Sequence, residues 1–267
     1  MIAYVSPGPW RDVLTLVLGV LTGVLSGAFG VGGAIVATPG VRFLGASTFL
    51  AVGTTLPAIV PGAVAATARY AREGLIDWPA VAAAAPAGMV AAVIGSLAAH
   101  AVPGDGHWLM VLTAALLALA AIRMGRSANS PRPAPEGPSP ARRRHGAPAA
   151  AGVGASAGLL SGLLGVGGGL LLVPGFGQLL GLPMKHAIAT SLACVGIIAV
   201  PGTLTHAVLG AVDWRIAGLL ALAAIPGARL GAAVAITANE AHLRRTVALT
   251  LGIVAVIYAA TEVAAMV

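Results

Sequence analysis

Long apolar stretches alternate with short polar breaks along most of this chain. The apolar segments lie at about 12–41, 46–68, 79–101, 107–124, 149–180, 186–210, 215–237 and 245–266. A stretch of roughly 18 or more apolar residues is long enough to cross a bilayer as a helix. The pattern therefore predicts an all-α, polytopic transmembrane helical bundle with about eight membrane segments.

One polar segment is much longer than the others and divides the chain. Residues 125–147 are rich in Pro, Ser, Ala and Arg, a composition that cannot bury a core. We therefore expect a first transmembrane repeat at 11–124, a disordered cytoplasmic linker at 125–147, and a second transmembrane repeat at 148–267.

The two predicted repeats share a glycine-rich motif. Residues 23–33 and 158–168 both read G-x-x-S-G-x-x-G-x-G-G, and each motif is followed by a proline, Pro39 or Pro174, so the offset is 135 throughout. Two later pairs recur at an offset of 136. These are Thr54-Thr55 with Thr190-Ser191, and Asp77-Trp78 with Asp213-Trp214. Internal duplication of this kind is typical of transporter folds.

The relative orientation of the two repeats depends on their first segments. If every segment is a simple span, the repeats are parallel and Arg244-Arg245 lies outside. If the first segment of each repeat breaks at its glycines and returns to its starting side, the repeats are inverted. The inverted arrangement places most short-loop cations in the cytoplasm, with Arg42 as the exception. The positive-inside rule therefore favours inverted repeats.

The glycine motif is costly as helix sequence, because glycine is less favourable than alanine inside a helix by about 1 kcal/mol. Non-helical backbone at membrane depth is tolerated where it is buried in protein or lines a cavity. We therefore expect broken helices whose freed N–H groups face a ligand. The glycines concerned are Gly30, Gly32, Gly33, Gly165, Gly167 and Gly168. The alternative is close helix packing, which we assign to the glycines upstream of each break.

Hydroxyl side chains that recur in both repeats are further candidates for the binding site. A hydroxyl donates a hydrogen bond to an anion without bringing a full charge into the membrane. In membrane helices, Ser and Thr also bond to carbonyls of their own helix, which is the alternative interpretation. The candidate hydroxyls are Ser26, Thr54, Thr55, Ser161, Thr190 and Ser191.

Two ionisable residues lie inside predicted membrane segments. Arg229 is a candidate substrate-binding residue, because an ionisable group at membrane depth is by default a functional hypothesis. A carboxylate partner, or snorkelling toward one face, is the alternative. We interpret His206 as a packed or interfacial histidine, with a proton-linked role as the alternative.

Composition excludes several other classes of protein. The chain is 58% hydrophobic and only 9% charged, which is too few charges for a water-soluble surface. The net charge of +7 is explained by the positive-inside pattern, and with 4% aromatic residues we expect no nucleic-acid binding. Residues 165–169 lack the Lys-Ser/Thr of a phosphate loop. We name no catalytic residue, metal site or cofactor, and therefore predict no enzyme.

The doubled glycine motif, the hydroxyl pairs and the Asp-Trp pairs together resemble the TauE/SafE family of sulfite exporters. The resemblance covers nearly the whole chain outside the linker. It implies export of small sulfur-containing anions, such as sulfite or organosulfonates, across the bacterial inner membrane. The chain departs from exact repetition at Ala34, where the second motif has Gly169.

The sequence thus favours a multi-pass secondary transporter that works by alternating access. Its expected partners are the lipid bilayer and a small anionic substrate, with a homodimer as a further possibility. The alternatives are an anion channel, an importer of another small anion, and a non-transporting membrane scaffold.

Overall fold

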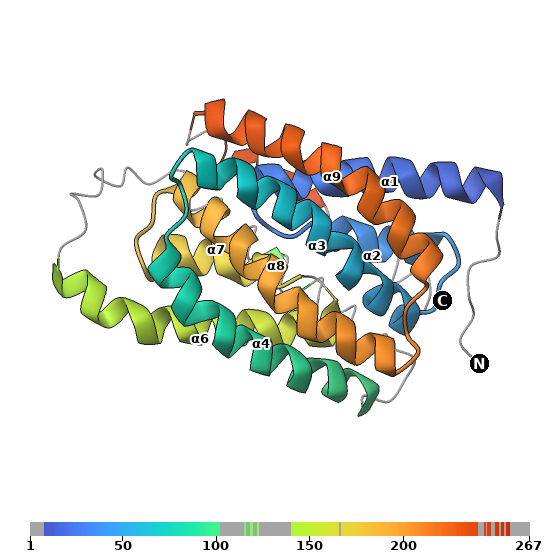
Figure 1. The fold of residues 1–267 in the computed structure, drawn as a ribbon, viewed down its shortest axis with the longest axis horizontal. Coiled ribbons are helices and arrows are strands. Elements are labelled where there is room, and N and C mark those ends of the chain that lie inside the picture. The colour runs from blue at the N-terminus through green and yellow to red at the C-terminus, as the bar shows by residue number, and fades with distance from the viewer. Residues whose placement is uncertain are drawn as a thin grey trace.

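The computed structural model describes residues 8–101, 140–165 and 167–239, together with residues 115, 118–119, 122, 243, 245–246, 249–250, 252–253 and 255–256. Helices make up the described part, which contains no strand (Figure 1). They are α1 (Pro9–Phe29), α2 (Ala34–Phe43), α3 (Thr48–Arg72), α4 (Trp78–Ala101), α6 (Pro140–Leu164), α7 (Gly169–Gln178), α8 (Met184–Val208) and α9 (Trp214–Thr237). The predicted segments at 107–124 and 245–266 fall largely outside the described residues.

Six of the described helices are long and apolar enough to cross a membrane. They are α1, α3, α4, α6, α8 and α9, with between 21 and 25 residues each. At about 1.5 Å per residue, such helices match a hydrocarbon core about 30 Å thick. Helices α2 and α7 have only 10 residues each. Each of the predicted segments 12–41 and 149–180 is therefore a long helix, a glycine break and a short helix.

The helix α6 begins earlier than the sequence predicted. It starts at Pro140, so residues 140–147 are helical although the predicted disordered linker extends to 147. Proline is favoured in the first turn of a helix, and the alanines and arginines that follow are strong helix formers. Residues 125–139 lie outside the described part.

In each half, the short helix runs back along the long helix that precedes it. Gly33, at the start of α2, lies against Thr22, whereas Gly40, further along α2, lies against Leu18. The second half repeats this arrangement, with Gly168 against Ala157 and Gly175 against Val153. The long and short helices thus form an antiparallel hairpin, and α2 ends at the same end of the molecule where α1 begins.

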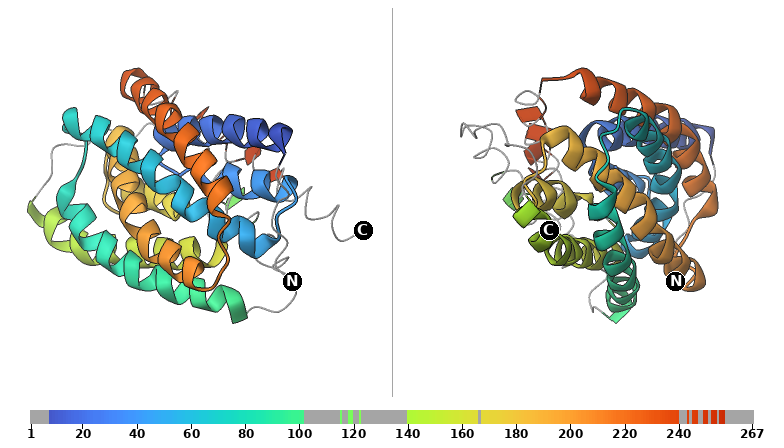
Figure 2. Two further views of the ribbon diagram at one scale, coloured as in Figure 1. Left: turned by 45° about the vertical axis from the view of Figure 1, so that its right-hand side comes forward. Right: turned by 60° about the vertical axis from the view of Figure 1, so that its left-hand side comes forward.

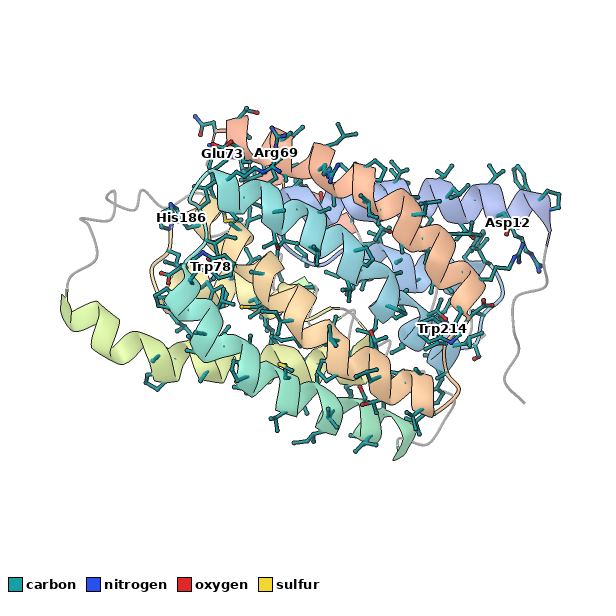
Figure 3. All side chains as sticks on the ribbon, viewed as in Figure 1. Asp12, Arg69, Glu73, Trp78, His186 and Trp214 are labelled. Carbon is teal, nitrogen blue, oxygen red and sulfur yellow. The ribbon has the colours of Figure 1, made fainter. Side chains whose placement is uncertain are left out.

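Helices α3 and α8, which occupy corresponding positions in the two halves, start at opposite ends of the molecule. The start of α3 lies beside the start of α9, because the Asp213 N–H donates to Thr54 Oγ1 at 2.9 Å. The start of α8 lies beside the start of α4, because the Asp77 N–H donates to Thr190 Oγ1 at 3.0 Å. Figure 3 shows Trp214 at one end of the bundle and Trp78 at the other.

The last described helix of each half packs against the other half. Helix α9 lies along α1 and α3, and α4 lies along α6 and α8 (Figures 1 and 2). Glycines make these contacts close. A Cβ atom on Gly23 of α1 would collide with the backbone of Ala224, and one on Gly158 of α6 would collide with the backbone of Gly88. The upstream glycines therefore serve helix packing, as expected.

Candidate functional site

Each long membrane helix of a hairpin ends in a turn that requires glycine. Gly30, Gly32 and Gly33 have φ angles of 72°, 80° and 68°, and their counterparts Gly165, Gly167 and Gly168 have 65°, 76° and 67°. These angles lie in the left-handed region, where residues with a Cβ atom are strained. The helix therefore stops at Phe29 or Leu164 and resumes only after the last glycine.

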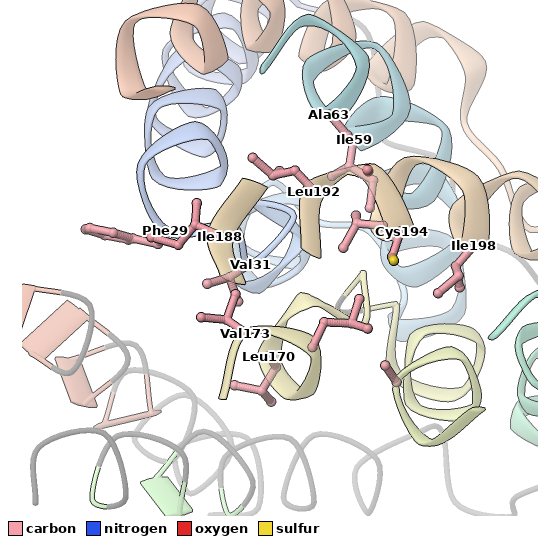
Figure 4. Close-up of a cluster of buried hydrophobic side chains, with 14 of the residues drawn as sticks. Phe29, Val31, Ile59, Ala63, Leu170, Val173, Ile188, Leu192, Cys194 and Ile198 are labelled. Atoms are coloured by element: carbon pink, nitrogen blue, oxygen red, sulfur yellow. The ribbon is translucent and has the colours of Figure 1, made fainter. Parts of the chain in front are cut away.

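The two glycine breaks touch each other in the middle of the molecule. A Cβ atom on Gly32 would lie 3.7 Å from Gly167 Cα, and one on Gly167 would lie 3.7 Å from Gly32 Cα. Figure 4 shows Val31 of the first break beside Val173 of α7 and Ile188 of α8. The segments that the sequence analysis singled out in each half thus form one central cluster.

This close approach explains why the two motifs differ at one position. A Cβ atom on Gly169 would lie 2.5 Å from the carbonyl oxygen of Gly30, so alanine does not fit there. The corresponding residue of the first half, Ala34, is completely buried and accommodates its Cβ atom. The two breaks are therefore not equivalent.

The N-terminus of α2, which follows the first break, has N–H groups that find no partner among the described residues. Its N-cap, Gly33, makes no side-chain capping bond, and the N–H groups of Gly32, Gly33 and Ile35 donate to no backbone carbonyl in the described part. In the second half, Gly168 likewise caps α7 without a side-chain bond. Free N–H groups and the helix dipole give such N-termini a partial positive charge.

Two of the predicted hydroxyls hold carbonyl groups at the breaks, each in the opposite half. Ser191 Oγ donates to the Gly30 carbonyl at 2.7 Å. Thr55 Oγ1 donates to the Val52 carbonyl at 3.0 Å and lies 3.5 Å from the Gly165 carbonyl. Thr38, which the sequence analysis did not single out, lies 3.1 Å from Thr55 Oγ1. The hydroxyls of α3 and α8 thus connect each half to the break of the other.

The remaining predicted hydroxyls of α3 and α8, those of Thr54 and Thr190, bind the loops that precede α9 and α4. Each hydroxyl oxygen accepts the backbone N–H of an aspartate in the other half, Asp213 or Asp77. Each aspartate in turn accepts backbone N–H groups of the helix that it precedes. These threonines are completely buried, and their hydroxyl oxygens are engaged by the protein itself.

Two buried hydroxyls beside the first break have no partner in the described structure. Thr22 Oγ1 and Ser26 Oγ make no hydrogen bond, although each residue is only 3% exposed. Both flank the N-cap of α2, because a Cβ atom on Gly33 would lie 2.5 Å from Thr22 Cγ2 and 3.2 Å from Ser26 Cβ. An unsatisfied buried hydroxyl is costly, so this pair indicates a missing hydrogen-bond partner.

Sequence reasoning found Ser26 but missed Thr22. The predicted hydroxyls are those that recur in both halves, and the counterpart of Thr22 is Ala157. The counterpart of Ser26 is the predicted Ser161, which is 1% exposed on α6. Helical spacing gave the missing signal, since Thr22 lies four residues before Ser26 and therefore on the same face of α1.

Arg229 does not join this central cluster. It is exposed on the outward side of α9, whereas the inward side of that helix presents Ala224 and Ala228. The helical period explains the placement, because a residue one position after a buried alanine points about 100° away from it. The structure thus separates Arg229 from the glycine breaks and the hydroxyls.

The described carboxylates also lie away from the centre. Asp12, Glu73, Asp77 and Asp213 are all at helix ends or in loops. Within the described part, no group of three or more His, Cys, Asp and Glu residues could hold a metal ion. The centre therefore offers neutral hydrogen-bond donors and helix N-termini, a combination that attracts anions.

Comparison with known proteins identifies the family. The family described as "Sulfite exporter TauE/SafE" matches residues 15–258. The chain belongs to the TauE/SafE family. With its six candidate spans, it is a multi-pass protein of a membrane transporter family.

Curated relatives of this TauE/SafE chain are similar to it along most of their length. The probable membrane transporter protein YunE of Bacillus subtilis is 26% identical over 262 residues, covering 92% of this chain and 94% of the relative. A probable membrane transporter protein of Xylella fastidiosa (strain 9a5c) is 31% identical over 221 residues, covering 82% of this chain and 83% of the relative. No solved structure matches the chain.

Proposed function

We propose that this chain is a secondary transporter that exports a small sulfur-containing oxyanion, such as sulfite or an organosulfonate. The observation that carries the proposal is the uncapped N-terminus of α2, flanked by two buried hydroxyls without partners. Oxyanions bind at helix N-termini because N–H groups and the helix dipole both favour negative charge. The name of the family supports sulfite as the first anion to test.

The anion accepts hydrogen bonds from the N–H groups of Gly32, Gly33 and Ile35, and from the hydroxyls of Thr22 and Ser26. The second break supplies the facing side of the site. The residues proposed there are Gly165, Gly167, Gly168 and Ser161. The hydroxyls of Thr55 and Ser191 keep the breaks in shape by holding the carbonyls of Gly165 and Gly30. Neutral donors suit a carrier, because it must release the anion as well as bind it.

Orientation in the membrane follows from the distribution of basic residues. Arg69, Arg72 and Lys185 lie at the end where α3 finishes and α8 begins, and α6 also begins at that end (Figures 1 and 3). By the positive-inside rule this end is cytoplasmic, in the bacterial inner membrane. The inside-negative potential then drives an anion outward by about 2.3 kcal/mol per charge per 100 mV.

Alternating access requires two bodies that move against each other around the central site. We propose that the two halves are inverted repeats and that each moving body contains helices from both. One body is α1, α2, α3 and α9, and the other is α6, α7, α8 and α4. The glycine contacts of α1 with α9 and of α6 with α4 lie inside these bodies, so they stay intact during the movement. The site between Gly32 and Gly167 lies where the bodies meet.

The proposal is tested by sulfite flux in liposomes containing the purified protein. Thr22→Val and Ser26→Ala each remove one donor to the anion, which weakens binding by about 1.5–3 kcal/mol. The apparent affinity is expected to fall roughly tenfold or more in each variant. Ser156→Ala is the matched control, because that hydroxyl lies on α6 and bonds carbonyls of its own helix.

Three results would contradict parts of the proposal. Unchanged affinity in both variants would remove Thr22 and Ser26 from the site. Flux that does not saturate with sulfite concentration would favour an anion channel. Absence of both flux and binding, for sulfite and for organosulfonates, would favour a membrane scaffold.

A further inference from the structure

Tyr70 and His206 occupy corresponding positions in the two halves and make the same contact. They are 136 residues apart, the offset that also relates Thr54 to Thr190. The Tyr70 hydroxyl donates to the carbonyl of Gly27 at 2.7 Å, and His206 Nε2 lies 3.3 Å from the carbonyl of Gly162. Both side chains are completely buried. Each therefore holds the carbonyl three residues before the first glycine of a break.

The two side chains differ in their capacity to titrate near neutral pH. A phenol keeps its proton across the physiological range, whereas an imidazole gains or loses one between about pH 5 and pH 8. Nε2 must carry a hydrogen to bond a carbonyl oxygen, so the neutral ring of His206 has its proton on Nε2. The second proton therefore binds at Nδ1 and turns the ring into a cation.

The position of His206 suits a cation that acts on the second break. Gly162 lies in the last turn of α6, where the helix dipole is negative. Gly165 follows three residues later, about 4.5 Å along the helix axis. A positive ring at this position strengthens its bond to the Gly162 carbonyl and attracts an anion held between the breaks.

Two glycines flank the His206 side chain in the described structure. It lies against Gly53 of α3 and Gly162 of α6, and the cations of α3, Arg69 and Arg72, are at the far end of that helix. The side chain of His100 on α4 lies outside the described part. Asp213, in the loop after α8, is the carboxylate closest along the chain, and its Oδ1 caps α9.

We propose that His206 couples the anion to a proton: the anion binds tightly when the ring is charged and is released when Nδ1 loses its proton. The inference rests on the proposed function, because it presumes an anion at the breaks. Tyr70 supplies the comparison within the same molecule, since it makes the equivalent contact without titrating.

The test is binding of ethanesulfonate, whose charge stays constant across the pH range, measured by thermal stabilisation of the purified protein. The wild-type affinity is expected to be at least tenfold stronger at about pH 5.5 than at about pH 8, the range in which histidine titrates. His206→Tyr copies the residue of the first half and should bind with an affinity that does not depend on pH. His206→Gln, which keeps an N–H donor, should behave in the same way.

His186→Gln is the control, because this histidine lies at the opposite end of α8 and should leave the pH dependence intact. The inference is overturned if wild-type affinity is constant over this range, or if both His206 variants keep the full pH dependence. A chain that binds neither ethanesulfonate nor sulfite at any pH overturns the proposed function, and the inference with it. A purely structural role for His206 predicts lower stability in the variants with an unchanged pH profile.

Discussion

Hydroxyls of the same chemical type have three different surroundings on helices α1, α3 and α8. Ser191 donates to a carbonyl of a break, Thr54 accepts the N–H of a loop, and Ser26 has no partner in the described structure. Burial alone does not separate them, since all three residues are almost completely buried. The partner of each hydroxyl decides its role, and only the unpartnered ones have a hydrogen bond to offer a ligand.

Removing a hydroxyl that holds a break should cost stability. Ser191→Ala leaves the Gly30 carbonyl without its described side-chain donor, and an unsatisfied buried acceptor costs about 1–3 kcal/mol. The melting temperature of the purified protein should therefore fall. Thr205→Val is the control, because Thr205 bonds a carbonyl of its own helix. Equal melting temperatures for Ser191→Ala and the wild type would show that the bond from Ser191 to the Gly30 carbonyl does not stabilise the fold.

The two motifs should tolerate opposite substitutions where they differ. Gly169→Ala would place a Cβ atom 2.5 Å from the Gly30 carbonyl oxygen, so one break must move away from the other. Overpacking of this kind typically costs about 1–3 kcal/mol. Ala34→Gly introduces no such collision and should be milder. Thermal unfolding compares the stabilities of the two variants. A larger loss of stability in Ala34→Gly than in Gly169→Ala would show that the structure relieves the collision at little cost in free energy.

At the scale of helices, small residues determine how closely the elements approach. The contacts of α1 with α9 and of α6 with α4 place glycine against backbone. Membrane helices associate through such close packing, because lipid provides no hydrophobic drive between them. The sequence motif therefore combines two roles: its upstream glycines bring helices together, and its last glycines end the helix.

Substitutions at two glycines of α6 distinguish the effect of close packing on stability from the effect of helix propensity. A Cβ atom on Gly158 would collide with the backbone of Gly88, whereas one on Gly152 would meet nothing within 4 Å. Gly158→Ala should lower the melting temperature. Gly152→Ala should leave the melting temperature unchanged or raise it, because alanine is more favourable than glycine inside a helix by about 1 kcal/mol. The same shift in both variants would mean that the close contact is unimportant.

Much of the helix pattern could be predicted from hydrophobicity, and the breaks from the glycine motif. The bounds of the short helices α2 and α7 could not, because these helices are apolar and continue the preceding segment without a polar loop. The site was predictable where a residue recurs in both halves, as Ser26 does. Thr22 has no such counterpart, and the actual partners of Thr54 and Ser191 depend on contacts across the halves that no local pattern contains.

At the scale of the whole molecule, corresponding residues of the two halves lie at opposite ends. Trp78 and Trp214 are both exposed, and Figure 3 shows them far apart. Tryptophan prefers the interface between hydrocarbon and water, so the two rings fit the two surfaces of one membrane. The same relation applies to Glu73 after α3 and Leu209 after α8.

Labelling from either side of the membrane tests this arrangement. Glu73→Cys and Leu209→Cys, each in a Cys194→Ala background, should react with an impermeant thiol reagent from opposite sides, with Glu73→Cys reacting from the cytoplasm. Cys194 is buried in α8, and its replacement by the slightly smaller alanine leaves a single reporter thiol in each variant. Reaction of both positions from the same side would restore parallel repeats.

The exchange of α4 and α9 between the halves has a consequence for biosynthesis. When α1 leaves the ribosome, the helix that covers its glycine face has not yet been made, since α9 follows almost two hundred residues later. Until α9 has been synthesised, the glycine face of α1 is therefore exposed to lipid or to an insertion chaperone. Truncated chains that end before Trp214 are consequently expected to be recognised and degraded, even though every span they contain is apolar enough to insert.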